Sequence, residues 1–587
     1  MRKGENGSMD QDKNIESLLN KNKVKGAGFV VLNEEGILYS NQLGVSDKEK
    51  EGDIIIDQNT KFPLDKMKKL FLPIAIMQLV EKEMISLDSD IKEYLPEFSI
   101  KNRFEESENT IKDLLENRAG IPSDDIDLFL KSNGKDYYAV LEYLKEQYLI
   151  APPKMMAAES EIGYVLLAII IEKITEKKYD EYLNENILKP MDIELYNVKT
   201  KEDVLERKND ITYLYNKNGK KVDERIYSLT PYQSNDYIKV SDYAKILHLL
   251  INNGKYQEKN IISAESVELL LNEPFFEDEV DGAEKKGMGL EFYQRYTKSI
   301  GKTIGLYDGK SKSSFIILKD KKLAAVAFSN TETNVNVSEK ICLELLENEL
   351  GVSFKLEKRQ KQNNYIKCRV EDYAGMYPTA NEQIEIYLGD FLTLEYGDKK
   401  YKMQMKKEGC FDLIETKKTI FSSTSKTHKT AYIDNGFLTL KEIEKDGTTE
   451  MKTVAYRIKP TEIDSEWRKA LGYYRVAKNN SKDVTAFDEM ELTIKKGFLF
   501  AEFRKNNVKR VMSLGCVNSN EAIILGYGDE SNSTVFLSLS TIKFNGLTFV
   551  KIKESPLNKV KEKRVNEEKI QKKNHKKKIN KMFDIEE

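Results

Sequence analysis

Residues 60–81 read TKFPLDKMKKLFLPIAIMQLVE. The second half of this stretch is apolar at helical spacing, and the pattern predicts a helix from Leu70 to Glu83. Three lysines, Lys66, Lys68 and Lys69, stand directly before the apolar run. Positive charge at a helix N-terminus opposes the helix dipole, at roughly 0.3–1 kcal/mol for each exposed lysine. The cluster is therefore either a solvated helix start or part of a site that offsets this cost.

The surrounding sequence, from about residue 26 to residue 351, alternates strand-like and helix-like segments. The predicted strands are 28–32, 36–39, 313–318 and 323–328, and further helices are predicted at 164–175 and 243–251. Asn33 to Gly36 is the expected turn of an early hairpin. Strands at both ends and helices between them predict an α/β domain whose sheet is assembled from both ends of the domain.

After Gly351 the pattern changes to short alternating strands. Residues 353–367 form a predicted linker, and two repeats follow at 368–460 and 465–553. Tyr373–Tyr377 (YAGMY) resembles 471–474 (LGYY), and 389–396 (GDFLTLEY) resembles 496–503 (KGFLFAEF). We predict two copies of one small antiparallel β-barrel or sandwich.

The chain ends are polar. Residues 1–8 precede a second methionine, Met9, and are expected to be an added leader outside a first domain at 9–352. Residues 559–587 form a Lys-rich tail, which we expect to be solvated; the alternative is an electrostatic arm for RNA, DNA or an acidic partner. The start has no apolar signal-peptide core, so we expect a cytoplasmic protein with no membrane partner.

Composition argues against several classes of function. The chain of 587 residues has 94 Lys and Arg against 97 Asp and Glu, a net charge of −3, so binding of nucleic acid is not expected. The four cysteines have no C-x-x-C spacing and the three histidines are scattered, so we expect free thiols and neither a metal nor an organic cofactor.

Several stretches of the first 350 residues match one known family. They are 60–81, 85–96 (ISLDSDIKEYLP), 111–115 (IKDLL), 119–122 (AGIP) and 165–175 (VLLAIIIEKIT). On these stretches the region resembles the serine beta-lactamases and penicillin-binding-protein-related serine hydrolases, including D,D-carboxypeptidases, D-aminopeptidases and esterases. The resemblance implies a beta-lactamase or transpeptidase-like α/β domain with an antiparallel sheet and a helical subdomain. The two β repeats resemble the lipocalin-like barrels appended to some members, notably D-aminopeptidases.

The family's nucleophile motif is Ser-x-x-Lys at the start of its first core helix. Positions i and i+3 share a helix face, so the lysine can take the serine proton. Here the matching residues are Lys66, Met67, Lys68 and Lys69. The resemblance thus keeps the lysine but places an amine where the acyl group would attach.

The other two motifs are also altered. The family's Tyr-x-Asn or Ser-x-Asn corresponds here to Glu159-Ser160-Glu161. Its Lys-Thr-Gly or His-x-Gly falls either on Lys302-Thr303-Ile304 or on Gly305-Leu306-Tyr307, and both alignments stay open. Lys302, Thr303 and Tyr307 are therefore the candidate substrate-binding residues. Ser234-Asn235 stands where the family has a Gly-Gly pair.

The replacements at the first two motifs are complementary in charge. We predict that Lys66 and Lys69 pair with Glu159 and Glu161, since buried charges persist when they are paired. The alternative is that the loop has shifted and both glutamates are exposed.

Three functional hypotheses follow from these motifs. The first is a catalytically degenerate pseudoenzyme that binds a small molecule or a protein partner, or acts as a scaffold. The second is an enzyme using Lys66, Lys69, Glu159 and Glu161 for acid–base or imine chemistry. The third, a serine hydrolase with a displaced nucleophile, is the weakest, because no other Ser-x-x-Lys fits the scaffold. The strand-rich repeats could also support a homo-oligomer.

Overall fold

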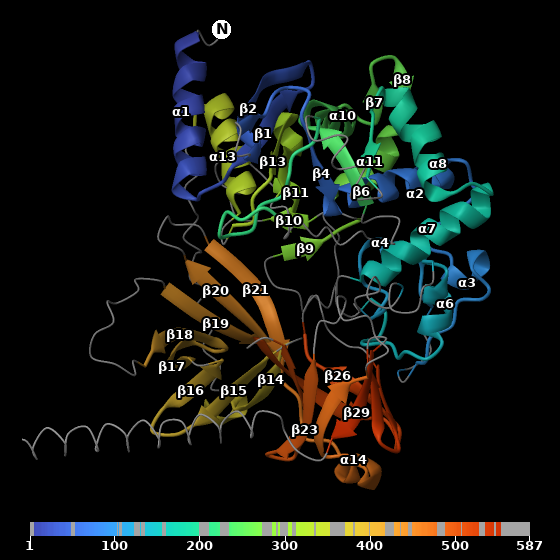
Figure 1. Cartoon of the computed structure of the whole chain (residues 1–587), viewed down its shortest axis with the longest axis vertical. Helices are drawn as coiled ribbons and strands as arrows, with labels where there is room; N and C mark the ends of the chain where they lie inside the picture. The colour runs from blue at the N-terminus through green and yellow to red at the C-terminus, as the bar shows by residue number, and fades with distance from the viewer. Residues whose placement is uncertain are drawn as a thin grey trace, which may run out of the picture. The chain divides into compact units, whose positions relative to one another are not determined.

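The computed structural model describes most of the chain between Glu5 and Ile552 (Figure 1). The stretches outside this description are 1–4, 49–52, 103, 105–107, 123–129, 131–135, 155–159, 199–209, 223–233, 273–283, 289–290, 294–302, 308–312, 334–335, 353–369, 380–381, 398, 417–427, 435, 444–448, 478–487, 506–507, 528–533, 545–546 and 553–587. By internal contacts the chain divides into two compact units. They are Met1–Ile458 with Gly526–Ser533, and Lys459–Leu525 with Thr534–Glu587.

The first unit contains an eight-stranded antiparallel sheet in the order β3-β2-β1-β13-β12-β11-β10-β9. Its strands are β1 (Gly26–Asn33), β2 (Gly36–Lys48), β3 (Asp53–Ile55), β9 (Glu284–Lys286), β10 (Glu291–Tyr293), β11 (Thr303–Tyr307), β12 (Ser314–Leu318) and β13 (Leu323–Ser329). Strand β1 pairs with β13 from Ala27 opposite Ser329 to Asn33 opposite Leu323. The prediction of a sheet assembled from both ends of the domain is confirmed, as is the turn between Asn33 and Gly36.

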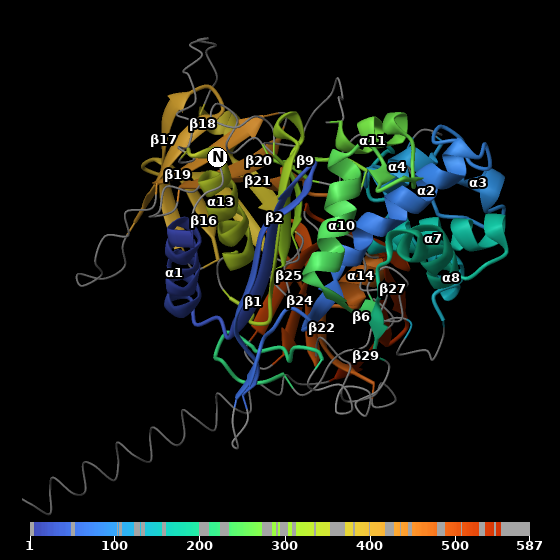
Figure 2. The ribbon, with the colours of Figure 1, turned by 90° about the horizontal axis from the view of Figure 1, so that it is seen from above.

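Helices cover both faces of this sheet. Helices α1 (Glu5–Lys21) and α13 (Val337–Leu350) lie on one side and α10 (Val240–Ile251) on the other (Figure 2). Phe29 and Val31 of β1 join the apolar cluster under α1 and α13, whereas Val30 and Leu32 join the cluster on the side of α10. A strand with two covered faces must be apolar at every position, which explains the sequence GAGFVVLN.

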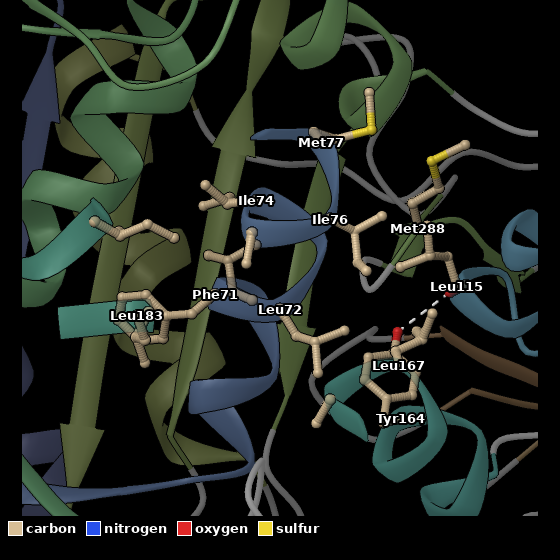
Figure 3. Packing of buried hydrophobic residues seen from close by; sticks show 14 of the residues in the cluster. Phe71, Leu72, Ile74, Ile76, Met77, Leu115, Tyr164, Leu167, Leu183 and Met288 are labelled. Atoms are coloured by element: carbon tan, nitrogen blue, oxygen red, sulfur yellow. Dashed lines mark hydrogen bonds between the residues drawn. The ribbon is translucent and has the colours of Figure 1, made fainter. Parts of the chain in front are cut away.

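A helical subdomain continues the larger cluster. Its elements are α2 (Phe71–Glu81), α3 (Ile91–Tyr94), α4 (Ile111–Leu115), α6 (Ala139–Leu144), α7 (Glu161–Thr175), α8 (Tyr179–Leu183), η2 (Asn184–Leu188), η3 (Lys189–Met191) and α11 (Ala264–Leu271). Helices α2 and α7 pack against each other, with Leu72, Ile76 and Leu167 in the contact region (Figure 3). The three predicted helices at 70–83, 164–175 and 243–251 are confirmed.

The first unit also contains a three-stranded and a two-stranded sheet. Their strands are β4 (Lys61–Asp65), β5 (Tyr196–Asn197), β6 (Ser234–Lys239), β7 (Lys255–Tyr256) and β8 (Lys259–Asn260). Strand β6 lies between β4 and β5, and Ser234 stands opposite Asp65. This pairing places the start of β6 beside the segment that leads into α2.

Both C-terminal repeats form antiparallel sheets, as predicted, and each sheet has eight strands among the described residues. The first comprises η5 (Val370–Tyr373), β14 (Gly375–Pro378), β15 (Gln383–Leu388), β16 (Leu392–Tyr396), β17 (Lys399–Lys407), β18 (Cys410–Glu415), β19 (His428–Asp434), β20 (Phe437–Ile443) and β21 (Thr449–Tyr456). The second comprises α14 (Ser465–Lys469), β22 (Gly472–Val476), β23 (Glu489–Lys495), β24 (Phe498–Lys505), β25 (Val508–Cys516), β26 (Glu521–Leu525), β27 (Thr534–Ser538), β28 (Thr541–Phe544) and β29 (Leu547–Ile552). In the second repeat β22 also pairs with β29, which closes the barrel.

The two repeats share a structural device. Each begins with a short helix, and a buried tyrosine of the first strand then donates a hydrogen bond to a carbonyl four residues earlier. The Tyr377 hydroxyl donates to the Tyr373 oxygen at 2.8 Å, and the Tyr474 hydroxyl donates to the Ala470 oxygen at 2.5 Å. The similarity between YAGMY and LGYY therefore has a common structural cause.

The predicted boundaries stay predictions, because the division into two units does not separate the first repeat from residues 9–352. Residues 5–8 belong to α1, while the predicted linker and tail lie outside the described residues. Cys342, Cys410 and Cys516 are free thiols, as predicted, and Cys368 is not among the described residues. In the part of the chain that the structure covers, no helix has both the length and the apolar character needed to span a bilayer.

Candidate functional site

The segment that resembles the nucleophile motif is a tight turn between a strand and a helix. Strand β4 runs directly into the 3₁₀-helix η1 (Lys66–Leu70), and α2 follows at Phe71. A 3₁₀-helix has three residues per turn, so the backbone positions 66 and 69 fall on one side of it and position 68 falls on another. The predicted motif spacing is thus kept, although the lysines precede the α-helix rather than forming its first turn.

Lys68 is buried, with 1% of its side chain exposed. Its Nζ lies 2.7 Å from Oδ1 of Asp180 on α8 and 2.9 Å from Oδ2 of Asp236 on β6. Asp236 is itself buried and accepts a hydrogen bond from Nδ2 of Asn197 at 2.7 Å. The alternative of a solvated helix start is therefore wrong for Lys68, because two carboxylates from distant segments replace its water.

These carboxylates determine the charge state of Lys68. Burial alone would lower the pKa of the ammonium, but Asp236 and Asp180 offset this effect, and the pKa is raised above its ordinary value. The ring of Tyr179 lies 5.7 Å from the same Nζ. Lys68 is thus a fixed cation that ties η1 to α8 and β6.

Lys69 lies against an aromatic ring of the second motif's helix. Its side chain is buried, and Nζ is 4.1 Å from the ring centroid of Tyr164 on α7. The Tyr164 hydroxyl donates to the carbonyl of Leu115 at 3.2 Å, which fixes the ring (Figure 3). A cation over an aromatic face is attracted by the ring quadrupole. Lys69, the lysine that the motif retains, is therefore held between η1 and α7.

The second motif forms the start of α7. Ser160 caps the helix by accepting from the Gly163 nitrogen at 3.2 Å, and its hydroxyl donates to the Pro122 oxygen at 2.8 Å. The Ser160 nitrogen donates to Oδ1 of Asn117 at 3.2 Å. Glu161 is the first residue of the helix and is half-buried, a position where the helix dipole stabilises a carboxylate.

A carboxyl group that the sequence did not single out lies beside this cap. Glu116 directly precedes Asn117 and is 3% exposed. Burial raises the pKa of Glu116 to about 7, although the charges of Lys112 and Arg118 act in the opposite direction. Only its place between the matched stretches 111–115 and 119–122 could have pointed to it.

The third motif lies on or next to β11. This strand pairs with β12 through Gly305 opposite Ile316 and Tyr307 opposite Ser314, and it lies against η1. Lys302 is outside the described residues, and the side chains of Thr303 and Tyr307 are not described. The fold thus brings the strand of the third motif to the turn of the first, as the resemblance implies.

The predicted pairing of Lys66 and Lys69 with Glu159 and Glu161 stays a prediction. Glu159 lies outside the described residues, and so does the side chain of Lys66. The sequence analysis missed Asp180 and Asp236. The one weak signal was an aspartate two positions after Ser234, directly before Tyr237 and Ile238.

Comparison with known proteins gives a family match. The family model described as Beta-lactamase matches residues 12–344, which is more than half of the chain. Protein flp of Staphylococcus aureus strain N315 is 28% identical over 189 residues, 32% of this chain and 37% of that protein. Beta-lactamase-like protein 2 of Dictyostelium discoideum is 25% identical over 185 residues, 31% of this chain and 34% of that protein. The chain spans little more than a third of the length of these curated relatives.

Solved structures are similar over a larger part of the chain. The crystal structure of SurE with D-Leu has a TM-score of 0.55 at 14% identity and covers 78% of this chain and 100% of that one. The octameric penicillin-binding protein homologue from Pyrococcus abyssi has a TM-score of 0.49 at 17% identity and covers 90% of this chain and 99% of that one. At this identity the similarity to SurE shows a shared fold only.

Proposed function

The chain belongs to the beta-lactamase family, and we propose that it is a member without acyl-enzyme chemistry that acts by binding a ligand or a protein partner. The observation that carries the proposal is which residues occupy the turn that would hold the nucleophile in this family, and how they are buried. Lysine stands at position 66, and the next two lysines, Lys68 and Lys69, are buried in contacts within the fold.

The physical argument concerns what each lysine is free to do. Acyl transfer needs a hydroxyl or thiol with a base beside it. Lys68 is a cation fixed by two carboxylates, and Lys69 lies on the ring of Tyr164. Neither contact supplies a hydroxyl or a thiol for acyl transfer, which supports a role in binding or as a scaffold.

Covalent labelling tests this proposal. The full chain is incubated with a fluorescent penicillin and with a fluorophosphonate probe, alongside an active serine beta-lactamase, and adducts are located by peptide mass spectrometry. We expect no adduct on this chain. The Lys66→Ser variant, which places a hydroxyl at position 66, is the matched comparison. An adduct at that position would locate the site where the family's nucleophile stands. A stable ester on any serine of the unmodified chain would contradict the proposal.

A second candidate function is acid–base chemistry near the second motif. Glu116 favours it, because a carboxyl with a pKa of about 7 can both donate and accept protons near neutral pH. Its neighbour Asn117 is bonded to Ser160 at the second motif. Turnover of a panel of esters, amides and lactones that is lost in Glu116→Gln but kept in Lys66→Ala would favour this candidate. Imine chemistry at Lys66 or Lys69 would instead give a borohydride-trapped adduct with a carbonyl compound.

Location and assembly complete the proposal. We propose a cytoplasmic protein that meets a small molecule or a protein, and that can self-associate through its strand-rich repeats. Light scattering of the full chain gives its mass in solution and decides the question of self-association. Pull-down with the 366–555 region, compared with the full chain, tests for a protein partner of the repeats.

A further inference from the structure

A hollow in the first unit lies outside the motifs described above. Its volume is about 500 Å³, within the range of small-molecule sites. It lies between the β1–β2 turn, the end of α10, helix α11 and the short helix η4 (Lys319–Lys321) that joins β12 to β13. Figure 2 shows α10 and α11 on the same side of the sheet. None of its lining residues belongs to η1, α7 or β11.

The floor and the rim of this hollow differ in character. Leu250, Ile251, Val267 and Leu271 are buried apolar residues among its lining. The rim is charged, and two of its lysines are neutralised within the fold. Lys319 pairs with Glu268 at 2.8 Å, and Lys322 pairs with Glu34 at 2.6 Å.

Two opposite charges on the rim are left over. Asp320 and Lys321 line the hollow and are exposed, and neither forms an ion pair with another described residue. The amide of Asn253, on a left-handed residue with φ 54°, also lines the hollow. The unmatched groups are therefore one carboxylate, one ammonium and one amide above an apolar floor.

Two helices end at the hollow and add partial negative charge. Leu250 and Ile251 are the last residues of α10, and Leu271 is the last residue of α11. A helix C-terminus carries roughly half a negative charge, which favours a nearby cation. Asp320 and the two helix ends suit an ammonium group, and Lys321 suits a carboxylate.

We propose that this hollow binds a small zwitterion with an apolar side chain, of the size of an amino acid or a dipeptide. The ammonium of the ligand would lie by Asp320 and the helix ends, and its carboxylate by Lys321. The apolar side chain would cover Val267 and Leu271. This site is independent of the proposed function of the old cleft.

The proposal is tested by measuring the binding of two probes, leucine and leucyl-leucine, to the full chain. Ligand-observed NMR titration gives the affinity of each probe. Leucinamide lacks the carboxylate, 4-methylpentanoate lacks the ammonium, and glycine lacks the apolar side chain. We expect saturable binding of the two zwitterions at roughly millimolar concentration, and weaker binding of all three analogues. Saturation by leucinamide or 4-methylpentanoate as tight as by leucine would overturn the zwitterionic class.

Variants locate the site. Asp320→Asn and Lys321→Met are each expected to weaken leucine binding about two- to five-fold, the effect of losing one exposed ion pair. Asp88→Asn and Lys92→Met, exposed charges of the same domain outside the hollow, are expected to leave it unchanged. All four positions are exposed, so folding is maintained and is checked by circular dichroism. The absence of saturable binding, or binding that is lost in Lys66→Ala and kept in Asp320→Asn and Lys321→Met, would refute the site.

Discussion

Lys68 is a buried charge paired with two carboxylates, and its removal gives a direct prediction. In Lys68→Met the buried Asp236 loses its cation, which is the costly way to break a buried pair. Asp180 is 67% exposed and can be rehydrated, so we expect a loss of about 3 kcal/mol of unfolding free energy, toward the lower end of such effects. Urea unfolding followed by circular dichroism measures it.

A second substitution separates this pair from general damage to the turn. Combining Lys68→Met with Asp236→Asn removes both charges, and we expect part of the stability to return. Lys92→Met, an exposed lysine of the same domain, is the matched control and should change stability by less than about 0.5 kcal/mol. Equal stability of Lys68→Met and Lys92→Met would show that the buried pair does not exist in solution.

Glu116 makes a prediction about pH. Its pKa is about 7 in the folded chain and is lower, about 4.5, when the carboxyl is solvated. The folded state therefore binds this proton more tightly, so the contribution is complete below about pH 4.5 and is lost as the pH rises through about 7. Glu116→Gln should become more stable than the unmodified chain as the pH increases, by up to about 3 kcal/mol at pH 8.

The control for this pH effect is an exposed glutamate nearby. Thermal unfolding of Glu116→Gln, Glu108→Gln and the unmodified chain is compared from pH 4 to pH 8. Glu108 is exposed, and its substitution should not change the slope with pH. Parallel curves for Glu116→Gln and the unmodified chain would mean that Glu116 is ionised at neutral pH in the folded state.

These residues show which parts of the site can be predicted from the sequence. Lys66, Lys69 and Glu161 can be named from the sequence because motifs of neighbouring positions can be aligned directly, and their role in a site stays a prediction. The ion pairs of Lys68 were missed because Asp180 is 112 positions away and Asp236 lies further still. Only the fold brings α8 and β6 to η1, and no local pattern encodes such a contact.

At the scale of elements, the segment at 119–122 carries a testable constraint. Gly120 has φ 64°, and a Cβ added there would lie 2.2 Å from the backbone oxygen of Ala151. Gly351, which ends α13, has nearly the same φ of 65° but has no heavy atom within 4 Å of such a Cβ. Gly351→Ala should cost about 1–2 kcal/mol from the left-handed backbone alone. Gly120→Ala should cost more, because the backbone around Ala151 must also move.

The comparison of these two alanine variants uses one measurement, thermal unfolding by circular dichroism. Equal destabilisation would contradict the close approach of Gly120 to Ala151. We also expect the Gly120→Ala variant to loosen the cap of α7, because Asn117 and Pro122, on either side of Gly120, both form hydrogen bonds with Ser160.

Periodicity predicted the larger elements and missed the smaller ones. The helices near 70–83, 164–175 and 243–251 were found because their apolar spacing is maintained over several turns. The 3₁₀ geometry of η1 was missed because three lysines carry no apolar period. Strands β9 and β10 have three residues each, too few for an alternating pattern to be recognised.

At the scale of the whole molecule, the repeat in the sequence predicted two related β-sheets but not how each one ends. The second closes through β22 and β29, with Tyr473 opposite Ile552. Among the described residues of the first, β14 and β21 form no ladder, and Met376 forms a single bridge with Ile458. Closure depends on pairing between the first and last strands, which alternation within each strand does not determine.

The second unit contains the chain's only tryptophan, so its unfolding can be observed separately. Trp467 on α14 is fully buried, and its Nε1 donates to the Asn518 oxygen at 3.0 Å. Tyr474→Phe leaves the buried Ala470 carbonyl without its donor, and we expect it to lower the stability seen by tryptophan fluorescence by about 1–2 kcal/mol. Tyr377→Phe removes the same bond in the first repeat and should leave the tryptophan transition unchanged while shifting the circular dichroism transition. An equal shift of the tryptophan transition in both variants would show that the two units unfold as one, because a cooperative chain transmits a loss in either repeat to every probe.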